Sequence, residues 1–129
     1  MGKGIRSLAL CLALLATACS AKTVQNETLE ESDSHTFNAP YERLVNASRI
    51  GLLGMRLIIQ SEADEPGGHV IMFTRRASIN QWGGVGRLVV DAEAPHTVHF
   101  NYDKRFISWG AGQERYARNV FKKMDEALK

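Results

Sequence analysis

Four short apolar runs, each closed by turn-forming residues, constrain the fold more than any other feature of the sequence. They cover residues 55–61, 69–75, 85–91 and 96–102. The last run alternates apolar with polar residues, which is typical of a strand with one buried face. Because consecutive runs are joined by short turns, the strands that they predict pair antiparallel. The sequence therefore predicts a four-stranded antiparallel meander.

Two further segments bear on this sheet. Residues 106–109 include Phe106, Ile107 and Trp109 and are a candidate for a fifth strand or a buried connection. The glycine-rich segment 83–86 precedes a strand rather than a helix, and no Lys-Ser or Lys-Thr pair follows it, so it does not fit a phosphate-binding loop. We expect a tight turn or a β-bulge there.

Helical periodicity flanks the strands on both sides. Apolar residues recur at helical spacing from Tyr41 to Leu52, Pro40 suits a first helical turn, and Gly54 suits a left-handed C-cap. A second amphipathic stripe covers residues 113–128. Helices at both ends of a strand block predict an α+β domain in the order α-β-β-β-β-α, with one antiparallel sheet and both helices on its apolar face.

The first 18 residues have the features of a secretory signal peptide. Lys3 and Arg6 precede an apolar run from Leu8 to Ala18, which is too short for a spanning helix of about 20 residues. Removal of Lys3 and Arg6 from the 16 basic residues leaves 14, against 14 acidic residues. The charge balance therefore gives no support for a nucleic-acid partner.

Residues 15–18, Leu-Ala-Thr-Ala, lie directly before Cys19 and resemble the lipobox of bacterial lipoproteins. The resemblance implies that Cys19 receives a diacylglycerol, that signal peptidase II cuts before it, and that the new amino group is acylated. Ser20 stands where the lipoprotein sorting pattern uses aspartate for retention in the inner membrane, so the resemblance implies the outer membrane. Residues 16–18 also match an A-x-A site for ordinary signal peptidase, which would release a soluble periplasmic protein.

The part of the chain after Cys19 divides into two regions. Residues 19–38 are polar and acidic without a sustained period, and we expect a flexible tether. Residues 39–129 are expected to form a single α+β domain. Since Cys11 lies in the signal peptide, the mature chain has one cysteine and no internal disulfide, and its fold rests on packing.

The sequence offers little for catalysis or metal binding. His96 and His99, with His69 as a third candidate, suggest a metal site, but residues three apart on a strand point to opposite faces. Ser61 and Ser78, like Ser108, have no recognisable nucleophile context. We therefore expect no metal, no cofactor and no catalytic residues; a hydrolase would require a cleft that gathers a nucleophile with these histidines.

The segment 75–82 mixes arginines, amides and a tryptophan, a combination common where proteins bind partners. Arg75, Arg76 and Trp82 are candidates for a partner surface, and Trp109 is a candidate to join them.

As a whole, the chain resembles the small cell-envelope lipoproteins of unknown function that carry a helix, a meander and a closing helix behind a lipobox. The resemblance implies a lipid-anchored protein that faces the periplasm and has an accessory, binding or assembly role. Its implied partners are the membrane, through the anchor, and an envelope protein. The alternative from another class is a periplasmic inhibitor or small-ligand carrier that uses the sheet face opposite the helices.

Overall fold

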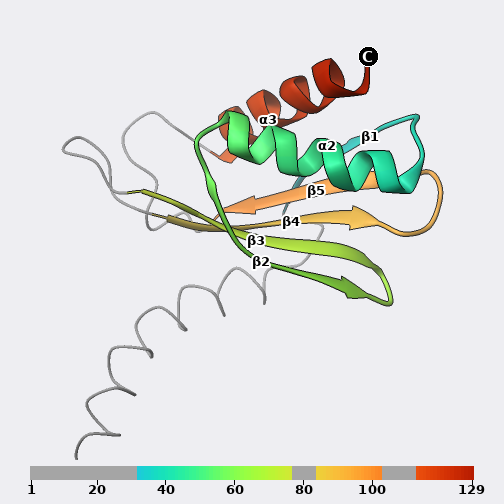
Figure 1. Ribbon diagram of the computed structural model, residues 1–129, viewed down its shortest axis with the longest axis horizontal. Helices are drawn as coiled ribbons and strands as arrows, with labels where there is room; N and C mark the ends of the chain where they lie inside the picture. Colours follow the sequence, from blue (N-terminus) through green and yellow to red (C-terminus); the bar gives the residue numbers. More distant parts are fainter. Residues whose placement is uncertain (1–31, 77–83, 103–112) are drawn as a thin grey trace, which may run out of the picture.

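The computed structural model describes residues 32–76, 84–102 and 113–129, which form one five-stranded antiparallel sheet with two helices on the same face (Figure 1). The α+β class and the meander are confirmed. Neither helix in the described ranges is long and apolar enough to cross a membrane. Along the chain, the elements are β1 (Asp33–Thr36), α2 (Tyr41–Gly54), β2 (Ile58–Glu65), β3 (Gly68–Arg75), β4 (Gly84–Asp91), β5 (Thr97–Tyr102) and α3 (Gln113–Leu128).

The fifth strand lies in the segment predicted to be a flexible tether. β1 pairs antiparallel with β5, and the strand order is β1-β5-β4-β3-β2. The coil predicted for residues 33–36 is therefore wrong, as is the order α-β-β-β-β-α, because a strand precedes the first helix. The physical reason is that β5 offers an open edge whose backbone groups satisfy those of a short, polar segment. The other candidate fifth strand, residues 106–109, lies outside the described residues.

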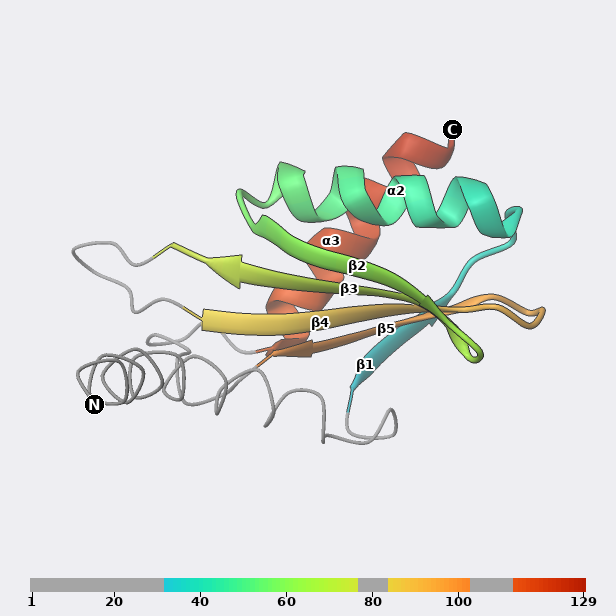
Figure 2. The ribbon, with the colours of Figure 1, turned by 60° about the horizontal axis from the view of Figure 1, so that its bottom comes forward.

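The two faces of the sheet differ in what packs on them. We call the face that carries Ile71, Leu88 and Phe100 the covered face, because these paired residues are fully buried in one core with residues of both helices. Figure 2 shows the sheet and the two helices from a second direction. The opposite face carries Val70, Val89 and His99, which are paired in the same way. Burial of each large apolar side chain on the covered face contributes about 1.5–3 kcal/mol to folding.

The helices pack against each other as well as on the sheet. On α3, Ala117, Val120 and Met124 recur at helical spacing and are buried, as the amphipathic stripe predicts. Val120 and Met124 contact α2 at Gly51, where an added Cβ would lie 2.9 Å from Met124 Cγ and 3.0 Å from the carbonyl oxygen of Val120. The absence of a side chain at Gly51 therefore allows the two helices to approach closely.

The end of α2 differs from the prediction in its left-handed residue. The helix ends at Gly54 as expected, but the residue with positive φ is Arg56, at 61°. The Arg56 N–H donates to the carbonyl oxygen of Leu53 and the Leu57 N–H to that of Leu52, at 3.0 and 3.1 Å. This is the Schellman pattern, with the buried Leu52 and Leu57 in the positions where its apolar contact is usual.

The expectation of a turn or bulge in segment 83–86 is not met at its described residues. Gly84 and Gly86 pair in regular register with Arg75 and Phe73, inside β4. A Cβ at Gly86 would lie 2.2 Å from Phe73 Cζ, so the glycine makes room for that ring. The register shift in the sheet occurs instead in β2, between Ile59 and Ser61.

Candidate functional site

The predicted partner surface lies partly in the described residues. Trp82 and Trp109 are outside them, as is Cys19. Arg76 follows β3 and is exposed. Arg75 is only 8% exposed, because it shares the covered face with alternate residues of β3. Arg75 therefore offers little surface to a partner, and the partner surface that includes Arg76, Trp82 and Trp109 stays a prediction.

Arg75 instead packs against two tyrosine rings. Its guanidinium carbon lies 5.8 Å from the ring centroid of Tyr102 and 5.5 Å from that of Tyr116. Its Nη1 donates a hydrogen bond of 2.7 Å to the hydroxyl oxygen of Tyr116. Cation–π contacts of this kind strengthen when water is excluded. Arg75 thus joins β3, β5 and α3 and has a structural role.

A charged cluster links α2 to the hairpin of β2 and β3. His69 Nε2 lies 2.7 Å from Glu62 Oε1, and His69 Nδ1 lies 2.8 Å from Asp64 Oδ1. Arg49 of α2 donates from Nε to the same Glu62 oxygen at 2.8 Å. The hairpin register produces this arrangement, since Asp64 pairs directly with His69. Both imidazole nitrogens therefore face carboxylate oxygens of β2.

Two groups, one in this cluster and one beside it, have shifted pKa values. Burial would raise the pKa of Glu62, but hydrogen bonds from His69 and Arg49, with their positive charges, lower it below its ordinary value. Burial, together with the negative charge of Asp64, raises the pKa of Tyr41. The cluster is therefore an electrostatic tie between the helix and the outer hairpin.

A second histidine is bound to an aspartate on the opposite face. His99 Nε2 lies 3.0 Å from Asp91 Oδ2, and His99 Nδ1 lies 3.4 Å from the hydroxyl oxygen of Ser32. His96 Nδ1 lies 3.0 Å from the backbone oxygen of Asp91. The separation of Ser32 from His99 exceeds the reach of about 2.6–3.2 Å expected between a nucleophile and its base.

The histidines do not form one site. His69 pairs with Val90 and His99 with Val89, so the two imidazoles lie on opposite faces of the sheet. Among the described residues, no group of three or more His, Cys, Asp or Glu side chains is arranged to hold a metal ion. Because they lie on opposite faces, His69 and His99 cannot both line the single cleft that a hydrolase would require.

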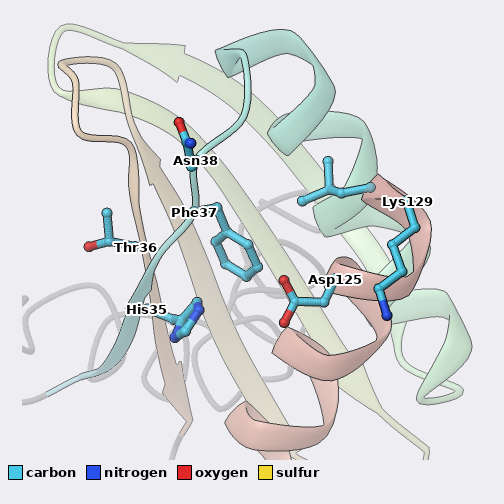
Figure 3. Close-up of a pocket in the computed structure, with 7 residues that line it drawn as sticks. His35, Thr36, Phe37, Asn38, Asp125 and Lys129 are labelled. Atoms are coloured by element: carbon cyan, nitrogen blue, oxygen red, sulfur yellow. The ribbon is translucent and has the colours of Figure 1, made fainter.

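A pocket of about 380 Å³ lies between the end of α3 and the segment formed by β1 and the residues after it. Figure 3 shows Phe37 and Asp125 pointing toward each other from the two sides, with His35 and Lys129 nearby and Thr36 directed away. The full lining is His35, Thr36, Phe37, Asn38, Asp125, Leu128 and Lys129.

Aromatic packing and one backbone contact hold the walls of this pocket in place. The His35 ring stacks on Phe121 with centroids 5.8 Å apart and meets the edge of Phe37 at 4.6 Å. Arg43 of α2 donates from Nη2 to the carbonyl oxygen of Leu128 at 2.9 Å, and so satisfies a backbone group at the end of α3. The pocket thus combines an aromatic wall, formed by Phe37, with one carboxylate and one ammonium group at its rim.

Sequence reasoning missed this pocket because it assigned residues 19–38 to a flexible tether. The signal that was present is the alternation of polar Ser34 and Thr36 with the aromatic rings of His35 and Phe37, a strand pattern of only four residues. Comparison with known proteins gives no further guidance: no family model matches the chain, and no curated protein is significantly similar to it.

Proposed function

We propose that the chain is a lipid-anchored protein of the bacterial cell envelope, whose domain faces the periplasm and binds another envelope protein in an accessory or assembly role. The observation that carries this proposal is the sequence of residues 15–18 before Cys19, at the end of a short apolar run. With Ser20 as the next residue, the outer membrane is the expected location. The role that we propose is a non-catalytic one.

The geometry of the domain is compatible with such an anchor. β1 begins at Asp33, so residues 20–32 connect Cys19 to the sheet. As a coil, this connection would separate anchor and domain by about 20 Å, from about 5–6 Å times the square root of its length. Three acyl chains, at about 0.8 kcal/mol for each buried CH₂ group, would make the attachment effectively permanent.

Labelling with palmitate tests the anchor directly. In bacteria that produce the full chain, we expect Cys19 to carry the label and the protein to sediment with the outer-membrane fraction. The variant Cys19→Ser should lose the label, because no thiol remains to accept the diacylglycerol. The matched control is Ser20→Ala, which leaves the thiol in place and should still be labelled and membrane-bound.

An unlabelled, soluble wild-type protein that begins at residue 19 would contradict the proposal. That result would indicate cleavage by ordinary signal peptidase at residues 16–18. Ser20→Asp adds a test of location, since aspartate directly after Cys19 should move the labelled protein from the outer to the inner membrane.

The alternative role, a small-ligand carrier that uses the face opposite the helices, has less support. Among the described residues, the side chains on that face are aliphatic or polar, as at Met72, Thr74 and Val89, and include no Phe, Tyr or Trp. A cavity of about 240 Å³ at the end of this face is lined by glycines, two valines and the charged Glu65, Arg87 and Asp91. Three of its seven lining residues carry a charge and none is aromatic, whereas ligand pockets are lined mainly by hydrophobic and aromatic side chains with few polar groups.

A further inference from the structure

The two outer strands of the sheet differ in how they are protected from pairing with another chain. β2 carries Glu62, Asp64 and Glu65 and a register shift after Ile59, which are common devices against edge pairing. β1 has neither a bulge nor a proline, and its only carboxylate is at its first residue, Asp33. No described strand pairs with the outer edge of β1.

The register of β1 identifies the backbone groups at this edge. The Phe37 N–H donates to the carbonyl oxygen of His96 at 3.2 Å, so the backbone of Phe37 faces β5. Backbone N–H and C=O groups of successive residues point to alternate sides of an antiparallel strand. Those of His35 therefore also point toward β5, whereas those of Ser34 and Thr36 point outward. The 2.9 Å bond between the hydroxyls of Thr36 and Thr97 fits this assignment, since side chains are closest in non-hydrogen-bonded pairs.

The pocket of about 380 Å³ lies beside this edge. His35 of β1 and the following Phe37 are on the covered face, and the other side is closed by Asp125 of α3 and by Lys129, which follows the helix (Figure 3). A strand added along Ser34 and Thr36 would place every second side chain on the same face as the pocket. Backbone pairing with side-chain pockets is the usual basis of recognition by β-strand addition.

We propose that β1 and the adjoining pocket bind an extended segment of a partner protein, which adds a sixth strand to the sheet and inserts an aromatic or long aliphatic side chain over Phe37. The apolar body of that side chain would contact the Phe37 ring, and a polar tip would reach Asp125 or Lys129 at the rim. This inference rests on the binding role proposed above, but not on the lipid anchor.

A second copy of the chain does not fit this site. If two β1 strands paired with each other, the residues available to enter the pocket would be Asp33, His35 and Phe37 of the other copy. His35 and Phe37 are already packed in the aromatic cluster of their own domain, with Phe121. A symmetric pair would leave both pockets empty, whereas a separate extended segment has side chains to fill one.

A phage-displayed library of random seven-residue peptides provides the probe. The bait is the full-length protein, held in nanodiscs if it carries lipid and kept in solution if it does not. Selected peptides are synthesised, and their binding is measured by fluorescence anisotropy. We expect enrichment of uncharged, strand-forming peptides with one aromatic or long aliphatic residue. Replacement of that residue by alanine should weaken binding about tenfold or more, since a buried aromatic side chain anchors many interfaces.

Substitution of Thr36 separates edge pairing from other modes of binding. Thr36→Pro removes the outward N–H and should reduce affinity about tenfold, which corresponds to the loss of about one well-formed hydrogen bond. Thr36→Val keeps the N–H and loses only the hydroxyl, so its affinity should stay within about twofold of the wild type. Asp125→Arg, at an exposed rim position, should alter which peptides are selected while leaving the fold intact.

Several results would overturn the proposal. One is a failure to enrich any peptide above the background given by Thr36→Pro, and another is binding that Thr36→Pro does not weaken. A concentration-dependent dimer abolished by Thr36→Pro would assign the edge to a second copy. Binding that begins only after deletion of residues 20–31 would assign it to the protein's own tether. Failure of palmitate labelling with peptide binding retained would instead contradict the anchor alone.

Discussion

At the scale of single residues, the described polar side chains are arranged mainly to join elements. His69 connects two carboxylates of β2, and Glu62 connects His69 to Arg49 of α2. Arg75 connects β3 to the tyrosines of β5 and α3. Each is a candidate functional residue by type alone, yet its contacts assign it to the framework that joins the helices to the sheet.

Replacement of Glu62 should change how stability depends on pH. The pKa of Glu62 in the folded protein lies below its ordinary value of 4.5. Its contribution to stability is therefore fully present above pH 4.5 and is lost as the pH falls through the folded-state pKa. In urea denaturation, Glu62→Gln should lower the free energy of unfolding by about 1 kcal/mol at pH 7 and flatten its decline below pH 4.5.

The matched control is Glu65→Gln, which removes the same charge at the turn of the same hairpin. It should change the free energy of unfolding by less than about 0.5 kcal/mol at pH 7. If both variants retain the wild-type slope below pH 4.5, the tie between His69, Glu62 and Arg49 does not contribute to acid stability.

Residue identity alone could not predict these contacts. The sequence identified His69 and His99 as notable, and the strand period indicated that His96 and His99 would not converge as ligands. It did not indicate that Asp64 would face His69, because that pairing depends on a register fixed by the turn at residues 66–67. The burial of Arg75 was missed because its acceptor, Tyr116, lies 41 residues away.

At the scale of elements, local periodicity predicted the strands and helices well where they are long. The meander and both helices follow from apolar spacing and turn residues. β1 was missed because it has four residues and its stabilising partner, β5, is more than 60 residues away in the chain. Tertiary pairing, not local propensity, makes this segment a strand.

The left-handed conformation of Arg56 makes this residue a position where a substitution can stabilise the protein. A left-handed conformation costs a residue with a Cβ about 1–2 kcal/mol, whereas glycine adopts it freely. After allowance for the greater flexibility of glycine in the unfolded chain, Arg56→Gly should raise the free energy of unfolding by about 0.5–1 kcal/mol in urea denaturation. Arg56→Ala keeps the strain and removes the charge, so it should not give this gain; equal stabilisation by both variants would contradict this explanation.

At the scale of the whole molecule, the helix layer depends on close contact between α2 and α3. Gly51→Ala should lower the free energy of unfolding by about 1–3 kcal/mol, because the new Cβ would meet the backbone of Val120 and the side chain of Met124. Gly54→Ala meets only the flexible Lys123 side chain, at 2.8 Å from Cδ, and should be neutral or slightly stabilising. Equal effects of the two substitutions in urea denaturation would show that helix propensity, not packing, governs both positions.

If the chain is anchored at Cys19 as proposed above, the placement of β1 has a mechanical consequence. A pull on the chain before Asp33 acts first on β1, whose pairing with β5 is the shortest in the sheet. If that pairing opened, residues 32–37 would become extended chain and add about 20 Å of reach, at about 3.3 Å for each residue. The same movement would withdraw His35 and Phe37 from α3 and remove one wall of the pocket. Tension on the chain and binding of a partner strand would then oppose each other. A bound strand would resist the opening of β1, and a pull strong enough to open β1 would release the strand.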